Sequence, residues 1–179
     1  HARHECLWVE ENRMYSRRQM LLAGGGLGVA VLAGGLLKQL NMVTEVEAAE
    51  AFEVSHTEAQ WRSLLTAEQF DVLREEGTER PYSSTLNDEH RAGTFACAGC
   101  ALPLFSSTTK FDSHTGWPSF WQPLDNAVAS HVDTSYGVVR KEIHCRRCGG
   151  HQGHVFDDGP APTGLRYCMN GVAMTFTAA

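Results

Sequence analysis

The stretch GLRYCMNGVAMTF, residues 164–176 near the C-terminus, contains the strongest local signal for both structure and chemistry in this chain. If its first half is a β-strand, successive side chains alternate between two faces. One face then carries Arg166, Cys168 and Asn170, and the opposite face carries the residues Leu165, Tyr167 and Met169. A guanidinium beside a thiol favours the thiolate, which is the reactive form. We therefore predict a reactive Cys168, although free cysteines also occur as small buried apolar residues.

The same stretch contains a break in its alternation at Asn170-Gly171. Apolar residues occupy odd positions before the break and even positions after it. An Asn-Gly pair between apolar alternations is a strong hairpin signal, but a β-bulge within one strand shifts the alternation in the same way. The sequence predicts either two strands that meet at a turn or one bulged strand.

The 179 residues are enough for one domain and a tail, and 42% are hydrophobic, as is ordinary for a globular protein. The formal net charge of −6 argues against a broad phosphate-binding surface, so we expect no nucleic-acid partner. We expect a monomer.

The N-terminal tail resembles a bacterial twin-arginine export signal. Arg17 and Arg18 stand just before Leu21–Leu37, an uncharged run rich in Gly, Ala, Leu and Val. Met14 is the expected initiator, which makes residues 1–13 a prefix and residues 14–51 the signal. Ala49-Glu50-Ala51 offers a small-x-small cleavage site. The domain is then 52–179, exported to the bacterial periplasm, and the alternative is a membrane anchor formed by an uncleaved signal.

Two short helices are expected at the start of the domain. Ser55-x-x-Glu58 and Thr66-x-x-Gln69 are capping-box patterns. The apolar residues that follow them are Trp61, Leu64, Leu65, Phe70, Val72 and Leu73. Gly77 ends the second helix, and Pro81 prevents its continuation.

After Pro81 the helical period disappears. Strands are predicted at Gly93–Ala96 and Val138–His144, with a weaker candidate at Val128–Asp133. Residues 111–120 are expected to form a loop, in which Phe120 packs onto the domain.

Four cysteines form two Cys-x-x-Cys knuckles: Cys97, Cys100, Cys145 and Cys148. Glycines beside the knuckles let the chain turn so that two sulfurs face one point. Four sulfurs suit a tetrahedral structural zinc ion, although the intervening residues 101–144 exceed the usual zinc-ribbon spacing. Two disulfides or a redox-active dithiol are the alternatives, and we favour one structural zinc per chain.

A glycine-rich turn with two histidines follows the second knuckle. It brings His151, His154 and Asp158 close in sequence to Cys168. Histidines are often only surface groups or satisfied core groups, but this pairing favours proton transfer.

These motifs together resemble the methionine-R-sulfoxide reductases of the MsrB or SelR type, over about Trp61 to Phe176. The matching segments are Thr78–Pro81, both knuckles, Lys110–Ser113, Gly116–Phe120, Gly153–Phe156, Asp158–Pro160 and Leu165–Asn170. The resemblance implies a mainly β domain of two antiparallel sheets, with N-terminal helices and a structural zinc away from the active centre. It also implies a nucleophile at Cys168 and a site shaped by Trp117, His151, His154, Asp158, Arg166 and Asn170.

The sequence departs from the family pattern at Thr115, Gln152 and Gly171. Many members have a resolving cysteine at the position of Thr115, a leucine at that of Gln152 and a serine at that of Gly171. The reductive step is unaffected, but the sulfenic acid left on Cys168 then needs an external reductant, a thioredoxin-like or other thiol.

The expected reaction converts the R epimer of methionine sulfoxide, in oxidised proteins or peptides, to methionine. Cys168 attacks sulfur and Arg166 favours its thiolate, while His154 donates the proton and His151 and Asp158 assist. Trp117 holds the substrate methyl group, and Asn170 fixes polar groups around the reacting centre. The alternatives are a zinc-knuckle binding module without catalysis and a disulfide-stapled secreted protein. The signal segment is the expected membrane contact if it stays uncleaved.

Overall fold

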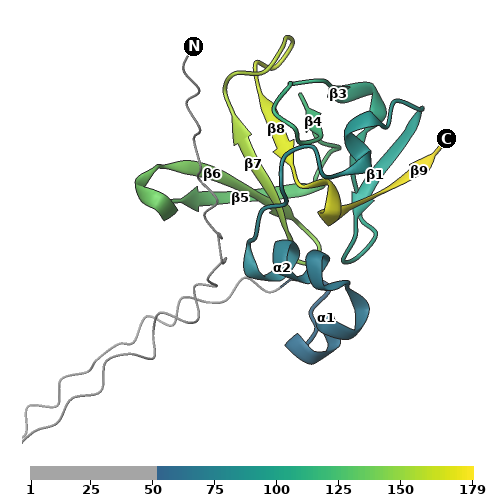
Figure 1. The fold of residues 1–179 in the computed structure, drawn as a ribbon, viewed down its shortest axis with the longest axis vertical. Helices are drawn as coiled ribbons and strands as arrows, with labels where there is room; N and C mark the ends of the chain where they lie inside the picture. Colours follow the sequence, from purple (N-terminus) through teal and green to yellow (C-terminus); the bar gives the residue numbers. More distant parts are fainter. Residues whose placement is uncertain (1–51) are drawn as a thin grey trace, which may run out of the picture. The chain divides into compact units, whose positions relative to one another are not determined.

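The computed structural model describes residues 52–179, in which two helices precede nine strands arranged in two antiparallel sheets (Figure 1). The expected mainly β fold with N-terminal helices is confirmed. The predicted prefix and export signal lie outside the described residues. Within residues 52–179, no helix is long and apolar enough to cross a membrane.

Both helices, α1 (Glu58–Leu64) and α2 (Ala67–Glu75), begin with a capping box. For α2 the box is the predicted pair of Thr66 and Gln69. For α1 the predicted position was wrong: the cap is Thr57, whose hydroxyl accepts from the backbone N–H of Gln60 at 3.3 Å. Glu58 instead forms an ion pair with Arg62 one turn later, at 2.9 Å.

The helices bury most of the predicted apolar residues. Trp61, Leu65, Phe70, Val72 and Leu73 are buried. Leu64 is 61% exposed. The seven-residue helix ends at Leu64, and the next apolar contact comes from Leu65 in extended conformation. Because Glu76 adopts a left-handed conformation with φ 58°, α2 ends at Glu75, two residues before Gly77.

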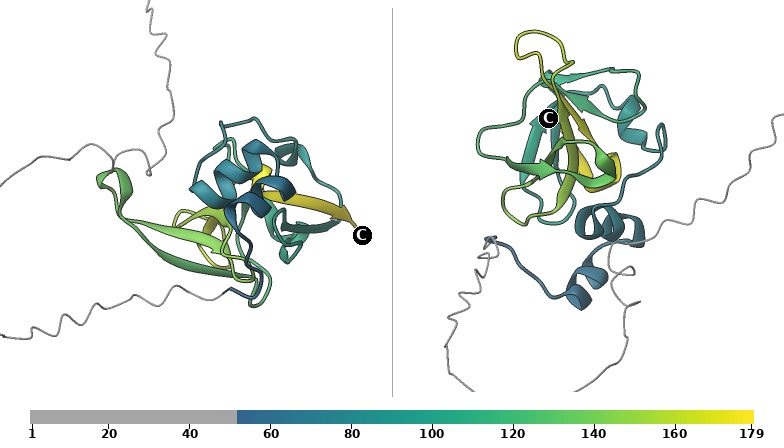
Figure 2. Two further views of the ribbon diagram at one scale, coloured as in Figure 1. Left: turned by 90° about the horizontal axis from the view of Figure 1, so that it is seen from below. Right: turned by 90° about the vertical axis from the view of Figure 1, so that its left-hand side faces the viewer.

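The smaller sheet has the strand order β2-β1-β9, and the larger has the order β3-β4-β8-β7-β6-β5. The smaller sheet comprises β1 (Gly93–Cys97), β2 (Pro103–Ser106) and β9 (Met174–Ala178). The larger comprises β3 (Lys110–Phe111), β4 (Ser119–Phe120), β5 (Val128–Asp133), β6 (Arg140–Cys145), β7 (His151–Phe156) and β8 (Arg166–Met169). The β5–β6 hairpin extends away from the helices and the smaller sheet (Figure 2).

The break at Asn170-Gly171 is neither a hairpin nor a bulge. The chain leaves β8 at Met169, makes the 3₁₀ turn η5 (Gly171–Ala173), and enters β9 in the other sheet. A Cβ on Gly171 would lie 2.0 Å from the Ser84 hydroxyl oxygen, so in this chain the Ser84 side chain would have to move to admit any larger residue there. The change of alternation marks the crossing between sheets.

Phenylalanine rings fill the space between the two sheets. Phe105 stacks on Phe120 at 4.3 Å between centroids, and Phe95 meets Phe120 edge-on at 5.0 Å. Tyr167 and Met169 pack on this core from β8, as the period-two pattern predicted. Their neighbours on β8 therefore project from the opposite face of the larger sheet, where the candidate site lies.

Candidate active site

A line of polar residues crosses the outer face of the larger sheet. The strand register places Ser119 opposite Cys168, Cys168 opposite His154, and His154 opposite Glu142. Residues directly opposite each other in antiparallel strands project from the same face. Four strands thus bring together residues that are far apart in the sequence.

Cys168 lies half-buried among hydroxyl groups. Its Sγ is 3.9 Å from the hydroxyl of Thr115. Ser113 Oγ links the hydroxyls of Thr115 and Ser119, at 2.8 and 2.7 Å. The loop between β3 and β4 therefore lies directly against the thiol, and Thr115 is its nearest polar group in that loop.

Burial raises the pKa of the Cys168 thiol above its ordinary value. A hydrogen bond with Thr115, the charge and hydrogen bond of Arg166, and a hydrogen bond with Ser119 act in the opposite direction but do not outweigh burial. Arg166 thus lowers the pKa of Cys168, as expected, but its effect is smaller than that of burial. The resting group is a protonated thiol at neutral pH.

Arg166 is held by Asp158 and by an aromatic ring. Its Nε and Nη2 donate to the two carboxylate oxygens of Asp158, both at 2.8 Å. Its guanidinium carbon lies 4.5 Å from the centre of the Phe156 ring. Sequence reasoning expected Asp158 to assist a histidine, whereas the structure uses its carboxylate to orient Arg166.

His154 is paired with a carboxylate from a neighbouring strand. Its Nε2 lies 2.9 Å from Oδ2 of Asp133, which also accepts from Arg140 at 2.7 Å. Burial lowers the pKa of His154; the hydrogen bond to Asp133 opposes this shift, and the charges of Arg140 and His151 add to it. His154 is therefore mainly neutral at pH 7, with its Nε2 hydrogen directed to Asp133.

His151 contacts a second carboxylate, Glu142. The distance from His151 Nδ1 to Glu142 Oε1 is 2.6 Å, and both side chains are buried. Burial alone would raise the pKa of Glu142, but hydrogen bonds and positive charge from His144 and His151 lower it to about 2. The rings of His151 and His154 meet edge-on at 5.5 Å.

Trp117 and Asn170 are joined through the backbone of Glu79. The indole N–H of Trp117 donates to the Glu79 carbonyl at 3.1 Å, and Glu79 N–H donates to Asn170 Oδ1 at 3.0 Å. The buried Asn170 also donates to the Gln152 carbonyl at 3.1 Å. Asn170 therefore joins β7 to the segment that holds the half-buried Trp117.

The four knuckle cysteines converge where the two sheets meet. Cys97 ends β1 and Cys145 ends β6, and each is followed by a turn that carries the second cysteine of its pair. Sγ–Sγ distances are 3.7 Å for Cys97–Cys148 and 3.5 Å for Cys100–Cys145, and the cysteines are free thiols. Four sulfurs around a zinc ion, with Zn–S bonds of about 2.3 Å, lie about 3.8 Å apart. The four cysteines could therefore hold a metal ion.

Comparison with known proteins identifies the family. A model of the SelR domain matches residues 65–178. The chain belongs to the SelR family. Similar curated proteins named peptide methionine sulfoxide reductase MsrB come from Thiobacillus denitrificans, Bradyrhizobium diazoefficiens and Methanosarcina mazei. They are 54%, 55% and 51% identical, and the matched regions cover 67–70% of this chain and 88–92% of each relative.

Three carboxylates of this SelR domain were missed as site residues by sequence analysis. Asp133 and Glu142 lie on neighbouring strands, and cross-strand partners have no local sequence signal. Glu79 lies in the segment Thr78–Pro81, which matches the family pattern, and its carboxylate accepts from the N–H groups of Gly171 and Val172. Burial raises the pKa of Glu79, and the two backbone hydrogen bonds oppose that shift.

Proposed function

We propose that this SelR domain reduces the R epimer of methionine sulfoxide, in oxidised proteins or peptides, to methionine. The observation that carries the proposal is the setting of Cys168, which has hydroxyls on one side, His154 directly opposite and Arg166 on the same strand. The names of the curated relatives support the reaction class. The choice of the R epimer rests on the family resemblance.

The protonated state of Cys168 suits this reaction, because sulfoxide reduction requires both a thiolate and a proton. Neutral His154 accepts the thiol proton, Cys168 sulfur attacks the substrate sulfur, and the proton passes to the sulfoxide oxygen. This oxygen then moves as a hydroxyl group from the substrate sulfur to the Cys168 sulfur, while the transient S–S bond breaks and releases methionine. The products are methionine and Cys168 sulfenic acid, so atoms and electrons balance. Asp133 stabilises His154 while it carries the proton.

The half-exposed indole of Trp117 holds the substrate methyl group, and Arg166 faces the polar part of the reacting centre. Four of the five cysteines in residues 52–179 belong to the knuckle cluster. An external thiol, thioredoxin-like or of another kind, therefore reduces the sulfenic acid.

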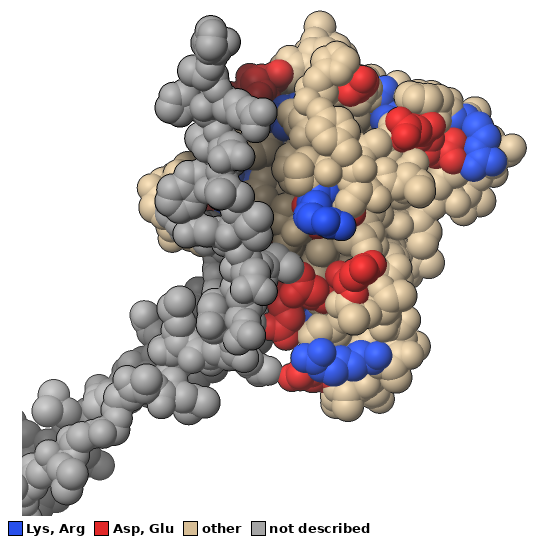
Figure 3. Space-filling model, in the orientation of Figure 1, with Lys and Arg blue, Asp and Glu red and all other residues tan. Residues whose placement is uncertain are grey.

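The knuckle cluster binds one zinc ion with a structural role. Four protein sulfurs leave no coordination position for substrate, and the ion stabilises the junction between the sheets. No broad basic patch is visible on the described part of the surface in Figure 3, where acidic and basic side chains are interspersed. We propose a protein or peptide substrate and no nucleic-acid partner.

The monomeric state and periplasmic export also belong to this proposal. Export rests on Arg17, Arg18 and the uncharged run after them. The signal segment, if it stays uncleaved, is the proposed membrane contact.

A reductase assay on both sulfoxide epimers with dithiothreitol tests the proposed activity. Wild type should release methionine from the R epimer alone, and Cys168→Ser should release none while it retains zinc and fold. Activity above a few per cent in Cys168→Ser would refute the nucleophile. No methionine from either epimer with wild type would favour the zinc-knuckle binding module.

A further inference from the structure

A cluster of histidines surrounds the buried carboxylate of Glu142. The cluster lies on the same face of the larger sheet as Cys168, two strands further towards the β5 edge. His131 lies directly opposite Glu142 on β5, and His144 follows two residues later on β6. Both project from the same face as Glu142. The proposed reductase reaction uses neither His131 nor His144.

The ligand-type atoms of this cluster converge on one point. Glu142 Oε2 lies 3.0 Å from Nδ1 of His131 and 2.8 Å from Nδ1 of His144. The three ligand atoms lie within 4.8 Å of one another. Tetrahedral ligands at about 2.0–2.1 Å from zinc are about 3.3 Å apart, so separating these atoms by a few tenths of an ångström admits an ion.

The ligand set matches the preferences of first-row divalent metals. Two imidazoles and one carboxylate form the protein part of several open zinc and iron sites.

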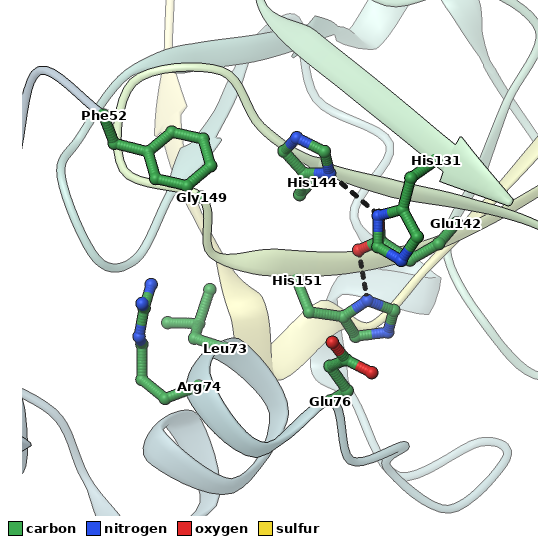
Figure 4. Close-up of a pocket in the computed structure, with 9 residues that line it drawn as sticks. All are labelled: Phe52, Leu73, Arg74, Glu76, His131, Glu142, His144, Gly149 and His151. Atoms are coloured by element: carbon green, nitrogen blue, oxygen red, sulfur yellow. Dashed lines mark hydrogen bonds and ion pairs between the residues drawn. The ribbon is translucent and has the colours of Figure 1, made fainter. Parts of the chain in front are cut away.

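The cluster lines a cavity that supplies an entry path. The cavity has a volume of about 240 Å³, and Glu142, His131, His144 and His151 share one wall of it (Figure 4). His131 is 53% exposed at its side chain, whereas Glu142 and His144 are buried. An ion can reach the exposed ligand first and complete its coordination with water from the cavity.

The charges around the cavity do not oppose a cation. Glu76 lines the cavity near His151 (Figure 4). Arg74 also lines it, but its guanidinium donates to the Cys148 carbonyl at 3.0 Å and lies over the Trp61 ring. The Arg74 guanidinium is therefore held across the cavity from His131, Glu142 and His144 (Figure 4).

We propose that Nδ1 of His131, Nδ1 of His144 and Oε2 of Glu142 bind a divalent transition-metal ion such as Zn²⁺. This site is separate from the four knuckle cysteines. The other carboxylate oxygen, Oε1, remains on His151. An ion here therefore withdraws negative charge from the carboxylate that orients a histidine of the reductase site.

Equilibrium dialysis against Zn²⁺ tests the site in the full chain, loaded with zinc at the knuckles. The chain should carry Cys168→Ser, so that the reactive thiol is not a competing ligand. This protein should bind one equivalent beyond the knuckle zinc. Adding His131→Ala or His144→Ala should weaken zinc binding at least about 100-fold. Loss of a residue that only hydrogen-bonds a metal ligand already lowers metal affinity about 10–100-fold, and loss of a ligand itself should cost more.

His114→Ala is the matched control, because His114 is an exposed histidine that pairs with one carboxylate, Asp112, at 3.1 Å. It should bind the additional zinc as the parent does. His131 is half exposed, so His131→Ala should fold even if His144→Ala does not. Circular dichroism and the knuckle zinc content report the fold of each variant.

A parent protein that binds only the knuckle zinc would overturn the proposal and leave a hydrogen-bonded cluster. Unchanged affinity in a folded His131→Ala variant would overturn it equally. Co²⁺ loaded at this position should show ligand-field absorption without thiolate charge-transfer bands, and thiolate bands would assign the ion to cysteine instead. These readouts do not depend on reductase activity, so failure of either proposal can be recognised separately.

Discussion

Replacing Thr115 by cysteine should give this chain an internal resolving thiol. The Thr115 hydroxyl is 3.9 Å from Cys168 Sγ, and a cysteine sulfur would occupy nearly the same place. After one turnover, the sulfenic acid on Cys168 would condense with the new thiol and release water. The small loop movement needed to bring the sulfurs to bonding distance is the only rearrangement required.

The new disulfide should also stabilise the fold. The two residues are 53 positions apart, and closing a loop of that length removes chain entropy worth about 4 kcal/mol at 25 °C. This is an upper value, since strain in the folded state subtracts from it. For a domain of this size it corresponds to a rise in Tm of roughly 10–15 °C over the reduced variant.

The assay is one turnover with methionine sulfoxide and no reductant, followed by peptide mass mapping and a dimedone-type probe. Thr115→Cys should yield the 115–168 disulfide, whereas wild type should keep a probe-reactive sulfenic acid. Thr115→Ser is the control that retains a hydroxyl. A persistent sulfenic acid in Thr115→Cys would show that the loop does not lie against Cys168 as described. An internal disulfide in wild type would mean either that Cys6 is retained or that a knuckle cysteine is not bound to zinc.

Four further changes test other parts of the site. Glu142→Gln should lower the free energy of unfolding at pH 7 by about 3 kcal/mol, because folding lowers the pKa of Glu142 from 4.5 to about 2. In urea titrations, the difference in unfolding free energy between wild type and variant should vanish as the pH falls from 4.5 towards 2. Arg166→Gln should move the alkylation profile of Cys168 to higher pH, and an unmoved profile would remove Arg166 from thiolate stabilisation. His154→Asn should slow single-turnover reduction about 10²–10⁴-fold, and an unchanged burst would assign proton transfer elsewhere. Cys100→Ser should lose zinc, measured by metal analysis, and unfold, since structural zinc contributes on the order of 10 kcal/mol; a stable, zinc-free, active variant would refute the structural site.

Local patterns in the sequence were sufficient for much of this domain. The alternation on either side of Cys168 predicted which side chains face the core, because strand geometry depends only on position along the strand. The capping box at Thr66 depends on residues three apart, and so does each cysteine knuckle. The first capping box was misplaced by two residues, because Ser55 and Thr57 both precede α1 and only the folded chain selects between them.

Tertiary structure decided which residues act together. Asp133 meets His154 and Glu142 meets His151 through the register of β5, β6 and β7, and nothing local to any of these residues specifies that register. Asp158 is near both histidines in sequence, yet it binds Arg166 across the turn before β8. The pKa of Cys168 is also a tertiary property, since burial depends on packing from several strands and outweighs the charge of Arg166. Sequence by itself determined the reactive groups, because side-chain chemistry is local, whereas their protonation and partners depend on distances that only the folded sheet creates.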